Sequence, residues 1–82
     1  MNDIILINNN GHEIATIEEL MLYVLDYYGN GGSYSNDLES DFYSLLIEED
    51  LVEDIEFSLD SLEQGYSILN AIEPNYWKIE EI

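Results

Sequence analysis

The sequence of 82 residues contains no cysteine and no arginine, and its one basic residue is Lys78. Without cysteine, the chain forms neither a disulfide framework nor a thiolate metal site. Direct binding of nucleic acid needs clusters of Lys and Arg, which are missing here. The scarcity of basic groups also argues against phosphate-binding enzymes, because such sites hold their substrates with cationic side chains.

Long apolar runs are also missing. The longest aliphatic run, "IILI" at residues 4–7, is far shorter than the roughly 20 residues of a membrane span. The start of the chain, "MNDIILINNNG", carries an acid where a signal peptide has basic residues. We therefore expect a soluble cytoplasmic protein that does not contact a membrane.

The residues that are abundant are acidic and apolar. The hydrophobic share of 46% predicts a folded core, and the length predicts a single domain over residues 1–82. Nineteen Asp and Glu residues give a net charge of −18. Self-repulsion on this scale destabilises a compact chain, so a function for the charge is expected. A general acidic domain with no special partner is the alternative.

Residues 3–15, "DIILINNNGHEIA", are typical of a β-hairpin. Asn10-Gly11 is the favoured pair for a two-residue type I′ turn, because both positions need a positive φ. This turn would pair Ile7 with Ile14, and it would place Ile5, Ile7 and Ile14 on one face.

Three helices are predicted after the hairpin. The first starts at Thr16, which forms a capping box with Glu19, and ends at Gly29. The second covers residues 35–50, with Ser35 or Asn36 as the N-cap. The third opens with a capping box formed by Asp60 and Glu63, continues to about Ile72, and is stopped by Pro74.

Two further segments complete the predicted fold. Residues 51–59 alternate in polarity and are predicted as a strand, with continuation of the helix as the alternative. Residues 75–82 are predicted as a final strand. The predicted order is β-β-α-α-β-α-β, an α+β domain with an N-terminal hairpin, about three helices and a small antiparallel sheet.

Catalytic and metal-binding residues are poorly represented. The one histidine, His12, lies beside the predicted turn, and no nucleophile motif accompanies it. Asp26, Asn30 and Asp37 surround a glycine-rich loop, but their order does not match an EF-hand. We therefore expect no enzymatic activity, no cofactor, no dedicated metal site and no small-molecule substrate.

The acids concentrate in one part of the chain, since eleven of the nineteen lie between residues 37 and 63. Over a globule about 30 Å across, the net charge amounts to about one charge per 1.7 Å, similar to duplex DNA. Tyrosine is enriched at protein interfaces and can stack on arginine while a carboxylate pairs with it. The predicted partner-binding residues are Asp37, Glu39, Asp41, Glu48, Glu49, Asp50, Glu53, Asp54, Glu56, Tyr27, Tyr34 and Tyr43.

In size and charge the whole chain resembles the small acidic inhibitors that phages and mobile elements carry. These include DNA-mimicking anti-CRISPR proteins, antirestriction proteins and the uracil-DNA glycosylase inhibitor. No motif is shared, so no residue role is transferred. The resemblance implies an inhibitor that occludes the DNA-binding surface of a CRISPR effector or another host defence nuclease, in the cytoplasm of the host bacterium if a phage encodes it. The alternative is an immunity protein or antitoxin that neutralises a basic nuclease toxin.

Overall fold

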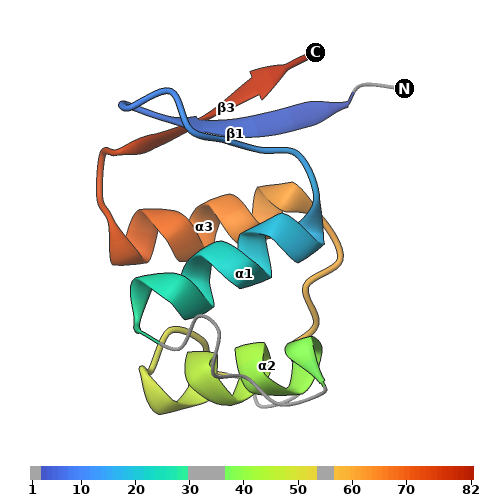
Figure 1. Cartoon of the computed structure of the whole chain (residues 1–82), viewed down its shortest axis with the longest axis vertical. Helices are drawn as coiled ribbons and strands as arrows, with labels where there is room; N and C mark the ends of the chain where they lie inside the picture. The colour runs from blue at the N-terminus through green and yellow to red at the C-terminus, as the bar shows by residue number, and fades with distance from the viewer. Residues whose placement is uncertain (1–2, 30–36, 54–56) are drawn as a thin grey trace. The chain divides into compact units, whose positions relative to one another are not determined.

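The computed structural model describes residues 3–29, 37–53 and 57–82. Its elements are β1 (Ile4–Asn8), β2 (Glu13–Ile14), α1 (Ile17–Tyr27), α2 (Leu38–Glu48), α3 (Leu62–Ile72) and β3 (Trp77–Glu81) (Figure 1). The described residues thus form three helices and a three-stranded antiparallel sheet. This confirms the predicted α+β class.

The chain divides into two compact units. The sheet unit comprises Met1–Leu20 and Leu59–Ile82, and the α2 unit comprises Met21–Ser58. The boundary falls within α1, between Leu20 and Met21. A single domain over residues 1–82 stays a prediction.

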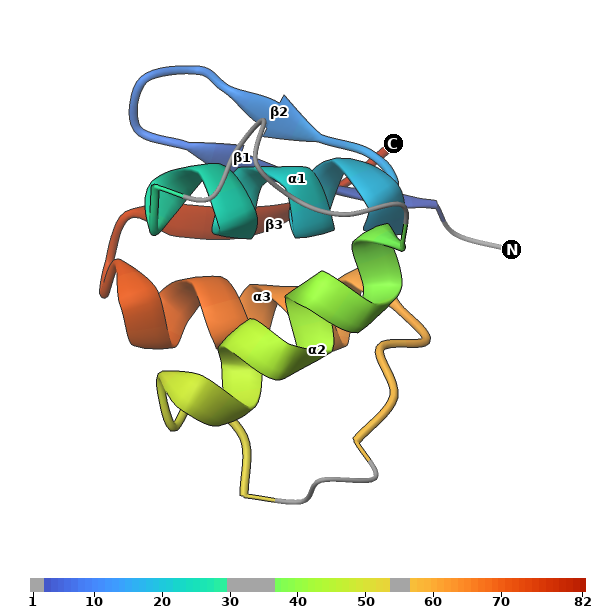
Figure 2. The same ribbon diagram turned by 60° about the horizontal axis from the view of Figure 1, so that its bottom comes forward.

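In the sheet unit, β1 is the central strand, with β2 on one side and β3 on the other (Figure 2). Helix α3 packs against β1 and β3. The core of this unit is apolar: Leu6 and Leu69 are fully buried, and Ile68 and Trp77 are nearly so. The sheet therefore joins the two ends of the sequence, because β3 from the C-terminal end pairs with β1 from the N-terminal end.

The predicted hairpin exists, but its register differs by one residue from the prediction. Leu6 pairs with Ile14, and both are fully buried, whereas Ile5 and Ile7 are only half-buried. Gly11 has φ +84° and Asn10 is not in the positive region, so a type I′ turn is ruled out. The observed loop has three residues: Gly11 N–H donates to the Asn8 carbonyl and Asn8 N–H donates to the His12 carbonyl, both at 3.0 Å.

The side chain of Asn8 explains this register. Asn8 is only 6% exposed, and its Oδ1 accepts hydrogen bonds from the Asn10 and His12 N–H groups at 2.9 and 3.0 Å. A buried amide needs such partners to offset its lost hydration. Because side chains alternate across a strand, burying Asn8 also places Leu6 on the inner face.

Helix α1 begins as the sequence predicts. The Thr16 hydroxyl accepts from Glu19 N–H at 3.1 Å, and the Glu19 carboxylate accepts from the Thr16 hydroxyl and from Ala15 N–H. After α1 ends, Gly29 has φ +81°, and its N–H donates to the Asp26 carbonyl at 3.0 Å. The predicted end at Gly29 is therefore confirmed within two residues.

The caps of the other two helices lie one or two residues beyond their predicted positions. The N-cap of α2 is Asp37, whose carboxylate accepts from Ser40 N–H at 3.2 Å; Ser35 and Asn36 lie outside the described residues. The N-cap of α3 is Ser61, which forms a capping box with Gln64 in place of the predicted Asp60 and Glu63. Asn36 precedes Asp37 and Asp60 precedes Ser61, and each of these neighbours is itself a favoured N-cap residue, so local sequence does not distinguish the true caps.

The predicted strand over residues 51–59 is not found in the described residues. Residues 51–53 and 57–59 belong to neither a helix nor a strand, while Asp54, Ile55 and Glu56 lie outside the described residues. The third helix does end at Ile72, as predicted, ahead of a turn around Pro74. In that turn Asn75 has φ +63° and Tyr76 N–H donates to the Glu73 carbonyl at 3.3 Å, which leads the chain into β3.

Candidate acidic interaction surface

Four exposed acids lie at the end of α2 and just after it. Glu48 ends the helix, Glu49 is its C-cap, and Asp50 and Glu53 follow. All four are exposed, and the last turn of α2 contains no basic residue. We refer to Glu48, Glu49, Asp50 and Glu53 as the α2 acidic cluster.

Backbone hydrogen bonds place Asp50 at the point where α2 turns. Asp50 N–H donates to the Ile47 carbonyl at 3.1 Å, and Leu51 N–H donates to the Leu46 carbonyl at 2.8 Å. These two bonds form a Schellman motif, which requires a left-handed residue at its centre. Asp50 has φ 58°, and glycine is the residue usually found there.

Glu48, Glu49 and Asp50 of the α2 acidic cluster also oppose the helix dipole. The carbonyl end of a helix carries partial negative charge, so carboxylates are unfavourable there by roughly 0.3–1 kcal/mol each at exposed sites. Asp50 adds the cost of a left-handed backbone. Local stability therefore does not account for acids at these positions.

The opposite end of α2 differs, because its acids stabilise the helix. Asp37 caps it, and Glu39 and Asp41 lie in its first turn, where carboxylates suit the dipole. Glu39 is exposed and Asp41 is half-buried. These three predicted partner-binding residues thus have a structural role that the α2 acidic cluster lacks.

Two tyrosines at the end of α1 belong to the same unit. Tyr27 is 48% exposed, and its ring meets that of Tyr28 edge to face with a centroid distance of 5.1 Å. Burial raises the pKa of the Tyr28 hydroxyl, and the charge of Glu49 and then Tyr27 raise it further. Glu49 is therefore close enough to Tyr28 to interact electrostatically, so an aromatic pair accompanies the cluster.

Tyr28 is not among the partner-binding residues predicted from the sequence. Its electrostatic link to Glu49 joins segments 21 positions apart, which local periodicity does not reveal. Ile47, beside the cluster in sequence, is 47% exposed and adds an apolar side chain at the end of α2. The sequence offers one signal for the exposure of Ile47, because this residue lies off the apolar stripe formed by Phe42, Leu45 and Leu46.

The remaining predicted tyrosine and acid positions separate into two groups. Tyr43 is half-buried, and its ring lies 5.4 Å from Phe42 and 6.3 Å from Phe57, which favours a packing role. Tyr34, Asp54 and Glu56 lie outside the described residues.

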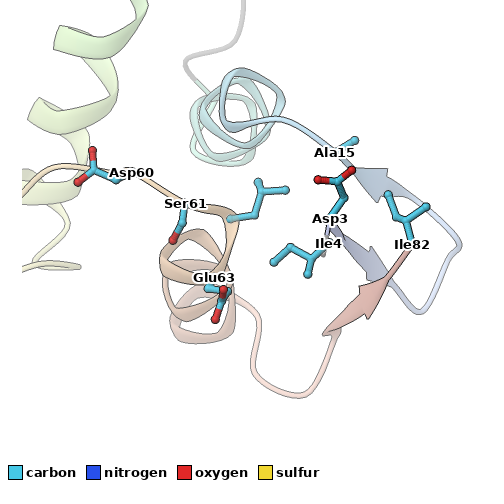
Figure 3. A pocket seen from close by; sticks show the side chains of 8 residues that line it. Asp3, Ile4, Ala15, Asp60, Ser61, Glu63 and Ile82 are labelled. Atoms are coloured by element: carbon cyan, nitrogen blue, oxygen red, sulfur yellow. The ribbon is translucent and has the colours of Figure 1, made fainter. Parts of the chain in front are cut away.

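The sheet unit contains a shallow pocket of about 580 Å³ (Figure 3). Its acids are Asp3, Asp60 and Glu63, and its apolar lining comes from Ile4, Ala15, Leu62 and Ile82. Ser61 also lines it, but the Ser61 hydroxyl accepts from Gln64 N–H as the cap of α3. No histidine or lysine lines this pocket, so Ser61 has no basic partner there.

His12 lies in the hairpin, where its ring meets Trp77 edge to face at a centroid distance of 6.0 Å. Trp77 in turn donates its indole N–H to the Glu73 carboxylate at 3.0 Å. Over the described ranges, no three acidic or histidine side chains converge as metal ligands. Over the same ranges, no helix has the length and apolar character needed to cross a bilayer.

By fold and surface, the chain is a small, strongly acidic α+β protein whose α2 unit contains ten acids and no basic residue. Comparison of the chain with protein-family models, curated proteins and solved structures found no match.

Proposed function

We propose that the protein is a nucleic-acid-mimicking inhibitor that binds the basic DNA-binding surface of a host defence nuclease complex and occludes it, as DNA-mimicking anti-CRISPR proteins do. Its place of action would be the cytoplasm of the host bacterium. The partner supplies Lys and Arg side chains that normally hold phosphates, and these form charge-assisted hydrogen bonds with carboxylates. No catalysis, cofactor or direct contact with nucleic acid is required.

The observation that carries this proposal is the α2 acidic cluster. Three of its four exposed acids, Glu48, Glu49 and Asp50, lie at the unfavourable end of the helix dipole, and Asp50 adopts a left-handed backbone. Acids that reduce stability are expected to persist where function needs them. A basic partner would remove the repulsion among them and make association fast and salt-sensitive.

The aromatic pair gives the proposed surface a way to recognise arginine. A guanidinium group can stack on the exposed Tyr27 ring while a carboxylate pairs with its N–H groups. Lysine lacks the planar group needed for this combination. We therefore expect arginine more often than lysine opposite Tyr27.

A capture experiment tests the proposal. The immobilised protein is incubated at low salt with lysate from a phage-susceptible bacterium, washed at rising salt, and the retained proteins are identified by mass spectrometry. Nucleic-acid-binding proteins of basic charge should be retained, and added duplex DNA should compete with their capture. Retention that duplex DNA does not reduce would contradict occlusion of a DNA-binding surface.

A pair of variants with equal charge locates the surface. Changing Glu48, Glu49, Asp50 and Glu53 to Gln or Asn removes four charges from the α2 unit. Changing the exposed residues Asp3, Glu13, Glu18 and Glu81 removes four from the sheet unit. The first variant should lose partner binding and the second should largely keep it. Equal losses would mean that net charge alone governs binding.

A nuclease toxin as partner is the second candidate, since it too presents Lys and Arg. Inhibition assays separate the two: a defence-complex inhibitor blocks DNA binding by the complex, whereas an immunity protein protects DNA from a purified toxin.

A further inference from the structure

One of the two outer strands of the described sheet is β3, whose composition suits self-association. In the order β2-β1-β3, the described residues place β1 on one side of β3 and no strand on the other. Lys78, Ile79, Glu80 and Glu81 are all exposed, and Ile79 is 39% exposed. An open edge of this kind is a template for pairing with another strand, and charged side chains such as those of Lys78, Glu80 and Glu81 oppose such pairing unless opposite charges meet across it.

Hydrogen bonds at both ends of the ladder fix which backbone groups face this edge. Ile82 N–H donates to the Asp3 carbonyl at 2.9 Å, and Asn9 N–H donates to the Tyr76 carbonyl at 3.2 Å. Hydrogen-bonded and non-hydrogen-bonded pairs alternate along an antiparallel ladder. The even-numbered residues of β3 therefore direct their backbone groups toward β1, in register with the pairs Ile7–Lys78 and Ile5–Glu80.

It follows that the N–H and C=O groups of Ile79 point toward the open edge. A strand added there must form hydrogen-bonded pairs at odd-numbered positions of β3. In a symmetric antiparallel pair of β3 strands, Ile79 can therefore face Ile79 of a second copy as a hydrogen-bonded pair.

We propose that β3 is a self-association edge, at which β3 of a second copy pairs antiparallel about Ile79 and joins two three-stranded sheets. In this register Lys78 of each copy lies opposite Glu80 of the other. These are non-hydrogen-bonded pairs, in which side chains approach most closely. The one basic residue of the chain thus forms two symmetry-related pairs with acids.

The neighbouring symmetric registers are unfavourable for electrostatic reasons. A shift that centres the pair on Lys78 places two lysines opposite each other, and a shift that centres it on Glu80 places two glutamates opposite each other. Like charges directly opposite on a sheet are destabilising. Only the register centred on Ile79 pairs opposite charges and also covers the exposed isoleucine.

The net charge of −18 on each copy opposes association, so the dimer should depend on salt. Raising the salt concentration from about 0.15 M to 1 M shortens the screening length from about 8 Å to 3 Å. This weakens the long-range repulsion more than the close cross-strand pairs. The inference is independent of the proposed inhibitor function, because it concerns β3 of the sheet unit and a second copy of the same chain.

Sedimentation of the full chain at both salt concentrations is the first test. The expected result is a concentration-dependent dimer that strengthens with salt. A monomer at both salt concentrations, up to the limit of solubility, would overturn the proposal.

The register is tested by cross-linking, which the absence of native cysteine makes unambiguous. Hydrogen-bonded pairs have Cα atoms about 5.5 Å apart, within the roughly 4.4–6.8 Å that a disulfide spans. Ile79→Cys should therefore give a disulfide-linked dimer on mild oxidation. The control, Glu81→Cys, places its two thiols about four residues apart along the strands, roughly 13 Å, and should link slowly. Equal rates would refute the register.

Charge-exchange substitutions distinguish dimerisation through the Lys78–Glu80 pairs from a general effect of the net charge on the dimer. Lys78→Glu and Glu80→Lys should each raise the dimer dissociation constant about tenfold, because each turns both cross-strand pairs repulsive. Combining the two substitutions should restore the dimer. Glu80→Lys also makes the chain less negative, as does the control Glu18→Lys on the exposed first turn of α1. If Glu80→Lys strengthens the dimer as Glu18→Lys does, the proposed pairing is wrong.

Discussion

Replacing Asp50 by glycine should stabilise the protein, which is the reverse of what most substitutions do. Asp50 sits at φ 58° in the Schellman motif that ends α2, and it is exposed. Glycine adopts this conformation without steric cost, and its introduction also removes a negative charge from the carbonyl end of the helix.

The magnitude follows from three contributions. The left-handed conformation costs an L-residue roughly 1–2 kcal/mol, with aspartate toward the low end. Removing the charge contributes about 0.3–1 kcal/mol at low ionic strength. The extra freedom of glycine in the unfolded chain costs about 0.4–1 kcal/mol. The expected net gain for Asp50→Gly is therefore about 1 kcal/mol.

Urea denaturation followed by far-ultraviolet circular dichroism measures this gain. With a slope of about 1–2 kcal/mol per M for a chain of this size, the midpoint should rise by roughly 0.5–1 M. Asp50→Asn keeps a residue that tolerates the left-handed region and removes the charge, so it should be stabilising by about 0.3–1 kcal/mol.

Asp50→Ala is the decisive comparison, because it removes the same charge as Asp50→Gly but tolerates the left-handed conformation poorly. The glycine variant should exceed the alanine variant by about 1 kcal/mol. Equal stability of these two variants would refute the assignment of a strained Schellman position. The proposed function adds that all three variants should weaken partner binding.

Three other predictions concern packing, titration and charge. Gly65→Ala should destabilise the fold by about 1 kcal/mol or more, although alanine favours helices, because its Cβ would clash with Cδ1 of the buried Leu20. Thermal denaturation measures this loss. Since the pKa of Tyr28 is raised, the folded chain keeps this proton to higher pH than the unfolded chain, so the free energy of unfolding should fall as pH rises above 10.0. Glu49→Gln should lower that pKa without returning it to 10.0, because burial is the larger cause; tyrosine ring signals in a nuclear magnetic resonance titration report it. The melting temperature at neutral pH should rise with salt, and a value independent of salt would mean that self-repulsion is negligible.

The sequence predicted the helices well because helix formation depends on neighbours within a few residues. The capping box of Thr16 and Glu19 and the stop before Pro74 are local features, and both were found. The errors fell at caps, where Asp60 and Ser61 both head patterns that fit a capping box. The formation of a helix is indicated by apolar periodicity over many residues, whereas the position of its N-cap depends on which of two adjacent side chains forms the capping hydrogen bond.

The strands were harder to predict because a strand is stable only with a partner. Asn10-Gly11 correctly indicated a hairpin, but the burial of Asn8 selected a different loop and shifted the register by one. Residues 51–59 alternate in polarity, yet the described sheet has β2 and β3 as its outer strands and does not include them. Alternation alone does not supply a pairing partner.

The sequence by itself determined the α+β class, the positions of three helices, and the excess of acids over a single lysine. Only the tertiary structure decided that Leu6 faces inward, that the pKa of Tyr28 responds to Glu49, that Asp50 occupies a left-handed turn, and that Lys78 and Glu80 lie on an outer strand of the described sheet. Composition and helical periodicity are carried by neighbouring residues, and can be read from the chain. Burial, register and electrostatic contact depend on residues far apart in sequence, and they arise only when the chain folds.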